Sequence, residues 1–498
     1  MSGFFLGQGK KHRKADACRA FLTQHEGKSA IQNRAGFGSP LPIDEKLHEE
    51  CGVFGIYDKT RTLDCARLTY YALYALQHRG QETCGIVAYD GEEFLDNKGV
   101  GLVPEVFNDF NLNRLKGYMS IGHVSFVSHP DSHKLNSQPL VTKYTKGTLA
   151  IANNGGLANH NKLINELEQN GAIFHSDTDA EIISYLMAWA RITSGTIENA
   201  LSEVMDKLIG AYSLVIMTPR KLIAARDPYG IRPLCIGRIG EAYVFASETA
   251  ALKAVGAEYL REVEPGEIVI ANEDGLTSRK EHVGKHRHSP CIFEYIYFAR
   301  PDSILDGQSV YEARRKAGEI LGRETRVDAD IVIGVPDSGL CAAIGYSQAS
   351  GIPYGIGIVK NRYVGRTFIQ PTQTVRQKNV EIKLTALESC VKDKRVVLVD
   401  DSIIRGTTSA NLIRLLKEAG AKEVHMRVSS PPFLWPCYFG TDIPNKHELA
   451  ANNLSCEELR QKIGADSLGY LDVEDLPKIV PNLSSYCDAC FSGNYPTY

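Results

Sequence analysis

The chain has 498 residues, enough for two large domains or three of average size. Hydrophobic residues make up 43% and charged residues 23%, as in ordinary globular proteins, and the net charge of −3 argues against a nucleic-acid-binding protein. No apolar stretch approaches the roughly 20 residues of a membrane span, and the first residues are too few for a signal-peptide core. We therefore expect a cytoplasmic protein with neither nucleic-acid nor membrane partners.

Residues 1–50 are polar, basic and rich in turn-forming residues, which predicts an N-terminal extension or propeptide. The segment contains Gly27-Lys-Ser29, the end of a phosphate-loop pattern, but Leu22 stands where that pattern requires glycine. The scarcity of acidic residues leaves an organelle-targeting peptide open as an alternative. We expect no nucleotide site here.

Residues 51–285 combine short strand-like runs with a few helical ones, which predicts two layers of antiparallel strands covered by helices. The strand-like runs are 53–57, 85–89, 212–217 and 267–271, and the helical runs are 68–76 and 180–191.

Residues 286–475 differ from the preceding part. Ile331-Val-Ile-Gly-Val335 and Val396-Val-Leu-Val399 are continuous apolar runs, as in strands that are buried on both faces, and a helical segment at 409–419 follows the second. This alternation predicts a parallel α/β sheet. The last residues, 476–498, form a separate segment that carries clustered cysteines.

The stretch from Arg395 to Ser409 has the most specific pattern in the chain. A buried strand brings Asp400 and Asp401 to its carboxyl end, where open α/β sheets bind ligands. Gly406, Thr407, Thr408 and Ser409 then begin a helix, whose N–H groups and hydroxyls can hold an anion. The alternative is a surface turn in which Thr and Ser only cap the helix.

Two further segments fit a phosphate site. Gly334-Val-Pro-Asp-Ser-Gly339 follows a buried strand, so its backbone N–H groups can hold a pyrophosphate. Lys360, Arg362 and Arg366 surround a glycine, which predicts a cationic flap over phosphates, although such a run alone also fits RNA contact or a solvated loop.

These three segments resemble the type I phosphoribosyltransferases, which use phosphoribosyl pyrophosphate (PRPP). The resemblance implies that Ser338, Asp400 and Asp401 contact the ribose and Mg²⁺. It also implies that the five residues from Arg405 to Ser409 hold the 5′-phosphate, with the flap of Lys360, Arg362 and Arg366 closing over the substrate.

Cys51 opens the run Cys51-Gly-Val-Phe-Gly55, directly after two glutamates. A thiol needs a nearby base to act as a nucleophile. If cleavage after Glu50 makes Cys51 the first residue, its own α-amino group supplies that base. The alternative is a buried cysteine that only begins a strand.

The residues around and after Cys51 resemble the glutamine amidotransferase branch of the N-terminal nucleophile hydrolases. The resemblance implies that Cys51 is the nucleophile and that Asn154 and Gly155 form the oxyanion hole. It further implies that Arg79 and Asp179 bind glutamine. Arg226-Asp-Pro-Tyr-Gly-Ile-Arg-Pro233 and Ala246-Ser-Glu248 are additional family landmarks.

Both halves in this order resemble the family of glutamine PRPP amidotransferases from about residue 48 to the C-terminus. The resemblance implies an N-terminal-nucleophile αββα sandwich followed by a type I phosphoribosyltransferase domain. It implies a pentosyltransferase that hydrolyses glutamine and passes ammonia to PRPP, giving 5-phosphoribosylamine, the first step of purine synthesis. The resemblance also implies inhibition by AMP and GMP and assembly into a homotetramer.

The chain departs from the family pattern at Ser125. The family usually has Gly-His-Val-Arg-Tyr, whose arginine binds the glutamine α-carboxylate, whereas this chain has Gly122-His-Val-Ser-Phe126. Loss of a charge-assisted contact costs about 1.5–3 kcal/mol. An ammonia-dependent synthase with an impaired glutaminase therefore stays open as one alternative. A non-catalytic PRPP-sensing regulator is a second alternative, because some proteins of the phosphoribosyltransferase fold have that role.

Four cysteines, Cys291, Cys437, Cys487 and Cys490, are candidates for one metal site. A C-x-x-C pair fits redox, zinc or iron–sulfur roles, and four cysteines suit either zinc or a [4Fe–4S] cluster. The surrounding residues resemble the branch of the family that carries a cluster and a propeptide, which implies a [4Fe–4S] cofactor on these four cysteines.

Overall fold

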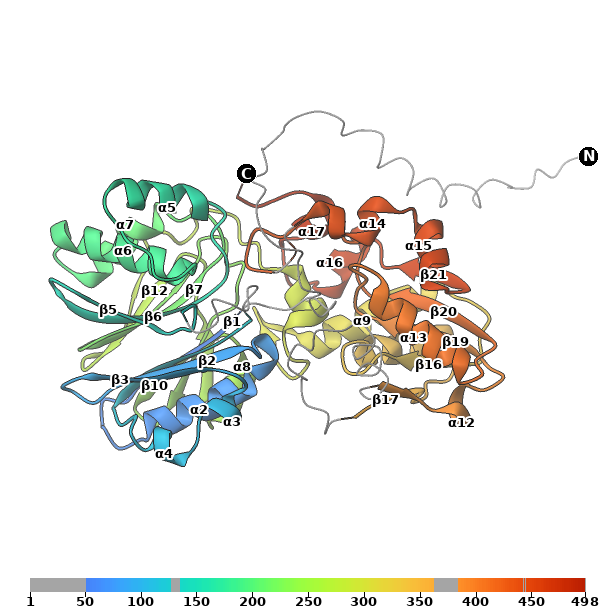
Figure 1. Ribbon diagram of the computed structural model, residues 1–498, viewed down its shortest axis with the longest axis horizontal. Coiled ribbons are helices and arrows are strands. Elements are labelled where there is room, and N and C mark those ends of the chain that lie inside the picture. Colours follow the sequence, from blue (N-terminus) through green and yellow to red (C-terminus); the bar gives the residue numbers. More distant parts are fainter. Residues whose placement is uncertain (1–50, 127–134, 362–383, 442, 444, 498) are drawn as a thin grey trace, which may run out of the picture.

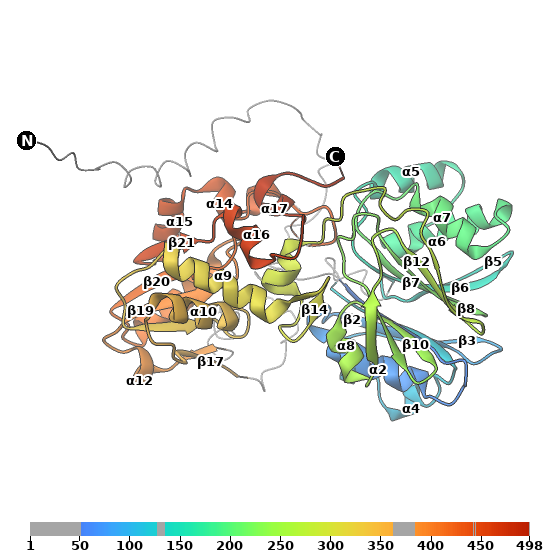
Figure 2. The same cartoon turned by 180° about the vertical axis from the view of Figure 1, so that it is seen from behind.

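The structure is a computed structural model that describes residues 51–126, 135–361, 384–441, 443 and 445–497. The predicted extension at 1–50 therefore lies outside the described residues, as do Arg362 and Arg366 of the predicted flap. The described chain forms two halves side by side, with residues up to about 280 in one half and most later residues in the other (Figures 1 and 2).

The nucleophile strand lies inside an antiparallel sheet of seven strands. In sheet order the strands are β11 (Glu258–Glu262), β9 (Cys235–Ile239), β10 (Ala242–Ala246), β1 (Cys51–Tyr57), β4 (Met119–Ser125), β2 (Thr83–Tyr89) and β3 (Phe94–Val100). Every residue of β1 is buried, as its run of small and apolar side chains predicts.

A second antiparallel sheet of six strands faces the first. Its order is β13 (Gly275–Arg279), β12 (Ile268–Asn272), β8 (Lys221–Arg226), β7 (Ser213–Thr218), β6 (Gly147–Asn154) and β5 (Leu140–Tyr144). An apolar core that includes Val53, Ile121, Ala152 and Val215 fills the space between the two sheets.

Helices cover the outer faces of both sheets (Figure 1). The first sheet is covered by α2 (Cys65–Ala75), α3 (Val103–Val106), α4 (Asp109–Leu112) and α8 (Thr249–Ala254), and the second by α5 (His160–Gln169), α6 (Asp179–Thr193) and α7 (Ile197–Met205). The predicted αββα sandwich is thus confirmed. The helix expected at 68–76 begins at Cys65, because the carboxylate of Asp64 accepts a hydrogen bond from the Arg67 N–H and caps the first turn.

The second half is built on a parallel sheet, which confirms the expected α/β domain. Its order is β16 (Ile331–Gly334), β19 (Arg395–Asp400), β20 (Glu423–Val428) and β21 (Ser467–Tyr470). One face packs on α9 (Val310–Glu324) and α10 (Leu340–Ser350), and the other on α13 (Thr407–Glu418) and α15 (Cys456–Ile463). Helices on both faces explain why β16 and β19 are continuously apolar.

The remaining elements are short and complete the two halves and the junction between them. They are the 3₁₀ turns η1 (Gln77–Arg79), η4 (Lys446–Glu448) and η5 (Val473–Asp475), the π-helical turn η3 (Glu294–Phe298), the strands β14 (Ile304–Leu305), β15 (Gln308–Ser309), β17 (Ile358–Lys360) and β18 (Leu384–Ala386), and the helices α12 (Glu388–Val391), α14 (Ala450–Asn453), α16 (Leu476–Ile479) and α17 (Ala489–Ser492). The turn η3 and α17 both pack into the core of the second half.

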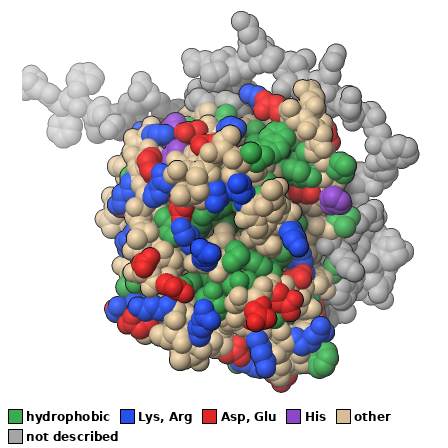
Figure 3. Space-filling model, turned by 90° about the vertical axis from the view of Figure 1, so that its left-hand side faces the viewer, with side chains coloured by type: hydrophobic (Ala, Val, Ile, Leu, Met, Phe, Trp, Pro, Cys, Tyr) green, Lys and Arg blue, Asp and Glu red, His purple; other side chains and the backbone are tan. Residues whose placement is uncertain are grey.

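On the outer face of the first half, positive and negative side chains are interspersed (Figure 3). This face therefore has no broad field of one sign that would attract nucleic acid. Among the helices of the described residues, none is both long and apolar enough to cross a bilayer.

Candidate active site

Cys51 is the first residue of β1, and its side chain is 7% exposed. Strand β4 lies between β1 and β2, and its last residue, Ser125, pairs with both Cys51 and Thr83. The hydroxyls of Ser125 and Thr83 are 2.5 Å apart. Ser125, where the family has arginine, thus lies beside the predicted nucleophile and is bonded to a neutral partner.

Asn154 ends β6 in the facing sheet. Strand residues alternate between faces, so Cys51 and Asn154 lie on the inner faces that Val53 and Ala152 define in the inter-sheet core. Both polar atoms of the Asn154 amide are buried, and neither has a hydrogen-bond partner among the residues that the structure describes. Native proteins rarely leave buried amides unpaired, so this one is available to a ligand.

Gly155 continues the chain with a φ of +136°, a conformation that favours glycine. A Cβ atom at this position would lie 2.3 Å from the carbonyl oxygen of Ala211. Gly155 is therefore required for the turn that directly follows Asn154. This geometry suits the predicted oxyanion hole.

Asp179 begins α6, and its carboxylate is held from the neighbouring loop. One oxygen accepts from the Leu157 N–H at 2.8 Å, and the other lies 2.6 Å from Nδ1 of His160. This contact raises the pKa of His160, against the opposing effect of burial. The structure thus places the predicted amine-binding carboxylate just beyond the turn that carries Gly155.

Arg79 lies in η1 and is completely buried. Its Nε donates to Glu248, and its Nη2 lies 2.5 Å from an oxygen of Glu294. Burial alone raises the pKa of the Glu248 carboxyl, but attraction to His78 and Arg79 outweighs burial and keeps that pKa well below its usual value. Glutamine binding by Arg79 stays a prediction, and it requires competition with two buried carboxylates.

Arg232 extends this ion-pair network to the second half. Its Nη1 lies 3.3 Å from Glu294, and its Nε and Nη2 donate to the carbonyl of Phe439 at 3.1 and 3.0 Å. The carboxylate of Asp227 accepts hydrogen bonds from the N–H groups of Ile231 and Arg232 and so fixes the turn that delivers Arg232. We call Arg79, Glu248, Glu294 and Arg232 the buried network.

The predicted phosphate site lies at the carboxyl end of β19. Asp400 and Asp401 are 2% and 4% exposed, and they line a cavity together with Gly406, Thr408 and Ser409. Gly406 has a φ of +86° and precedes α13, whose first residue is Thr407. The structure therefore brings the predicted acidic pair next to the N-terminus of a helix. This arrangement suits an anion that carries a bound cation.

Ser338 belongs to the same site, because its hydroxyl donates to Asp400 at 3.2 Å. Lys360 ends β17 and pairs with Asp337 at 2.8 Å, so the predicted flap begins beside the predicted pyrophosphate loop. Arg405 is bound by Glu448 at 3.1 Å next to the cavity.

The four predicted metal-binding cysteines come together at the junction of the two halves. Cys291 and Cys487 form a β-bridge, and Trp435 donates its N–H to the carbonyl of Cys490 at 3.1 Å. Burial, followed by the charges of the other three cysteines, raises the pKa of the Cys490 thiol. No disulfide joins these four residues, all of which are described.

The segment that carries Cys437 touches the predicted oxyanion loop. A Cβ atom on Gly156 would lie 2.6 Å from the backbone nitrogen of Gly440, so the two backbones are in direct contact. Ala158 and Ala211 of the first half share an apolar cluster with Cys437 and Cys487. The cysteine site and the predicted glutaminase site are thus neighbours.

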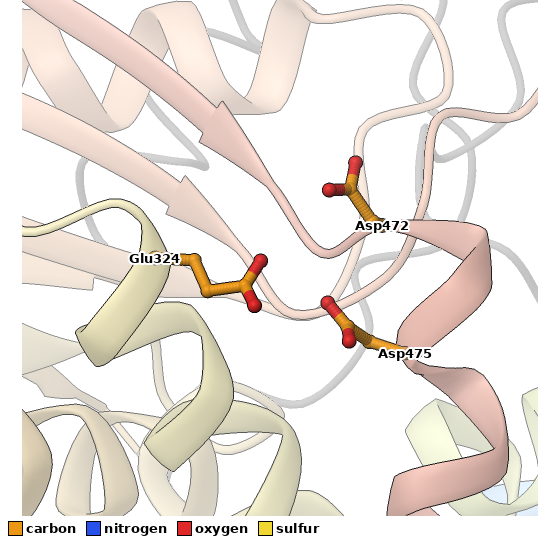
Figure 4. Close-up of side chains that lie close together, drawn as sticks. All are labelled: Glu324, Asp472 and Asp475. Carbon is orange, nitrogen blue, oxygen red and sulfur yellow. The ribbon is translucent and has the colours of Figure 1, made fainter. Parts of the chain in front are cut away.

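Outside these sites, a cluster of three carboxylates also brings possible metal ligands together (Figure 4). Glu324 at the end of α9 faces Asp472 and Asp475, with their ligand atoms within 4.8 Å of one another. Glu324 and Asp472 are exposed, and Lys478 forms an ion pair with Asp475. Exposed acidic groups of this kind are common without a metal, so the group adds no site.

Sequence reasoning missed the roles of Glu294, Arg232 and His160. Arg232 and Glu248 stand in the two landmarks at 226–233 and 246–248, but their partners lie far away in the chain. Two arginines and two glutamates spread over more than 200 residues give no local signal. Only the fold brings them together.

Comparison with known proteins decides the family. The amidophosphoribosyltransferase of Bacillus subtilis (strain 168) is 48% identical over 457 residues, which cover 91% of this chain and 95% of the relative. The chain belongs to the amidophosphoribosyltransferase family. The amidophosphoribosyltransferase of Archaeoglobus fulgidus is 47% identical over 449 residues, with 90% and 98% coverage.

Domain models and solved structures agree with this family. A glutamine amidotransferase domain model matches residues 125–254, and a phosphoribosyl transferase domain model matches residues 302–430. A solved glutamine PRPP amidotransferase from B. subtilis, complexed with ADP and GMP, superposes with a TM-score of 0.83 at 48% identity and covers 90% of this chain and 97% of that one. The resemblance of both halves to one amidophosphoribosyltransferase is thus confirmed.

Replacing Glu294 with glutamine tests the buried network. The variant leaves Arg79 and Arg232 in a dry junction with one fewer compensating charge, so we expect a loss of about 3–5 kcal/mol in the free energy of unfolding, measured by urea titration. Glu258→Gln is the matched control, because its pair with Arg238 is exposed and is worth less than about 1 kcal/mol. Equal losses in the two variants would contradict the importance of the network.

Proposed function

We propose that this chain hydrolyses glutamine at Cys51 and passes the ammonia to PRPP, giving glutamate, 5-phosphoribosylamine and pyrophosphate. Two observations of one site support this most directly: Cys51 begins a central strand, and the facing sheet carries the buried amide of Asn154, which has no partner among the described residues. The domain limits that go with the proposal are 1–50, 51–285, 286–475 and 476–498. Membership of the family makes this the first step of purine synthesis.

In the proposed glutaminase step, the Cys51 sulfur attacks the carboxamide carbon of glutamine. The α-amine of a processed Cys51 takes the thiol proton and returns it to the leaving ammonia. Asn154 Nδ2 and the Gly155 N–H donate to the oxyanion, and Asp179 binds the substrate amine. Water then cleaves the thioester and releases glutamate.

In the proposed transfer step, ammonia attacks the ribose C1 carbon while the bond to pyrophosphate breaks. The N-terminus of α13 binds the 5′-phosphate through Thr407, Thr408 and Ser409. Asp400 and Asp401 fit Mg²⁺ because they are adjacent, nearly buried carboxylates that line the cavity, with the Ser338 hydroxyl on Asp400. When bound, the ion neutralises charge on the pyrophosphate.

A [4Fe–4S] cluster on Cys291, Cys437, Cys487 and Cys490 is the cofactor that we propose for the junction. The four thiols lie close enough for the other three to influence Cys490, and none of them is in a disulfide. Four thiolates suit zinc or a [4Fe–4S] cluster, and the resemblance to the cluster-carrying branch favours the cluster.

Regulation and assembly also belong to the proposal. The solved B. subtilis relative is complexed with ADP and GMP, which supports purine nucleotides, AMP and GMP among them, as inhibitors of this chain. We further propose a cytoplasmic homotetramer. The chain matches relatives named amidophosphoribosyltransferase over almost their whole length. These relatives give no support to the ammonia-dependent synthase or to the PRPP-sensing regulator.

Replacing Cys51 with alanine tests the division of labour. We expect the glutamine-dependent formation of pyrophosphate to fall to background, because the variant has no nucleophile. The rate with ammonium chloride should stay within about twofold of the wild-type rate, since the PRPP site lies in the other half. Asp401→Asn is the matched control, and it should reduce both rates. A Cys51→Ala variant that still uses glutamine would contradict the proposal.

Metal analysis tests the cluster. The anaerobically purified protein should contain about four iron atoms and four sulfide ions per chain. It should also show the visible absorption of an iron–sulfur cluster. Cys437→Ser should lower the iron content, whereas Cys341→Ser, a change in a buried cysteine of α10, should leave it unchanged. Stoichiometric zinc without iron would contradict the cluster.

A further inference from the structure

His123 connects the two sheets of the first half next to the predicted glutaminase site. It lies on β4, two residues before Ser125, and pairs with Val53 of the nucleophile strand. The ring is completely buried. Its Nε2 lies 2.9 Å from the carbonyl oxygen of Asn153 on β6, so a hydrogen bond crosses from one sheet to the other.

The carbonyl oxygen fixes the protonation of the ring, because it can only accept. Nε2 therefore carries the proton, and Nδ1 is a lone-pair acceptor. Burial lowers the pKa of His123 to about 4, so the ring is neutral near pH 7. Nδ1 has no hydrogen-bond partner among the residues for which the structure gives positions.

The carbonyl that His123 binds belongs to the peptide group between Asn153 and Asn154. A peptide group is planar and its plane includes the Cα of Asn154, so holding the oxygen in place also fixes the position of that Cα. Asn154 is in turn followed by Gly155 with its φ of +136°. The His123 bond therefore acts on both proposed oxyanion donors.

Among the described residues, no hydrogen bond holds the Asn154 side chain. Backbone pairing with Ser213 of β7 fixes the strand, but the amide itself has no protein partner in the described part of the chain. Its position relative to Cys51 thus depends on how firmly β6 is tied to the sheet that contains β1. The His123 bond is a direct polar tie of this kind, one strand away from Cys51.

We propose that His123 is a positioning residue for the glutaminase step, whose Nε2–H bond to Asn153 sets the distance between Cys51 and the oxyanion donors Asn154 and Gly155. This inference rests on the proposed glutaminase. It adds a residue that acts through the peptide group before Asn154.

Two variants separate positioning from simple packing. In His123→Gln, the amide nitrogen stands as many bonds from Cα as Nε2 does and can still donate to Asn153. In His123→Asn, the amide nitrogen matches Nδ1 and falls short of that carbonyl. Glutamine hydrolysis and ammonia-dependent synthesis are measured for both full-length variants. His425→Asn is the matched control, since His425 is a buried histidine that bonds Ser467 in the parallel sheet.

We expect His123→Asn to lower the kcat of glutamine hydrolysis about 100-fold with KM for glutamine little changed, because misplaced donors weaken only the transition state. His123→Gln should recover most of that loss, and ammonia-dependent synthesis should be unchanged in both. The inference is overturned if both variants hydrolyse glutamine like the wild type, if they lose equal activity, or if His425→Asn loses as much as His123→Asn. A wild-type chain that does not hydrolyse glutamine overturns this inference together with the proposed function, whereas an active wild type with insensitive variants overturns the inference alone.

Discussion

The junction of the two halves depends on the buried network, in which Glu294 binds Arg79 and Arg232 at once. Removing four charged groups from water is costly, and a buried ion pair is often no more stable than apolar packing. Its value lies in geometry: the two arginines and two carboxylates balance in charge, and a shifted arrangement would leave at least one charge unpaired. The network thus specifies one way for the first half to meet the π-helical turn η3.

The proposed glutaminase site and the cysteine site are both close to elements that the network fixes. Gly80, directly after Arg79, packs tightly on Ser125: a Cβ atom on Gly80 would lie 2.3 Å from the backbone nitrogen of Ser125. Ser125 in turn pairs with Cys51. Arg232 holds the carbonyl of Phe439, the residue before Gly440, which contacts the oxyanion loop. The cysteine site begins three residues before Glu294. One set of ion pairs therefore bears on the nucleophile, the oxyanion loop and the proposed cofactor.

The sequence predicted the main elements well, and several of the residues that it singled out lie together at the end of β19. Continuous apolar runs identified β16 and β19, and the segment from Asp400 to Ser409 contained its whole cavity lining within ten residues. Patterns of this kind are local, so they survive without a structure. The partners of Arg79 could not be predicted, because Glu248 and Glu294 are 169 and 215 residues away from it in the chain. The same holds for the His123 bond, which links strands from two different sheets.

In the proposed function, one chain moves the amide nitrogen of glutamine to PRPP. The most direct measurement supplies [amide-¹⁵N]glutamine and PRPP with Mg²⁺ in the presence of excess unlabelled ammonium, and follows the isotope in the trapped product by mass spectrometry. The account predicts that the 5-phosphoribosylamine formed carries ¹⁵N in step with the glutamate released. Product that carries only the isotope ratio of the bulk ammonium would contradict it.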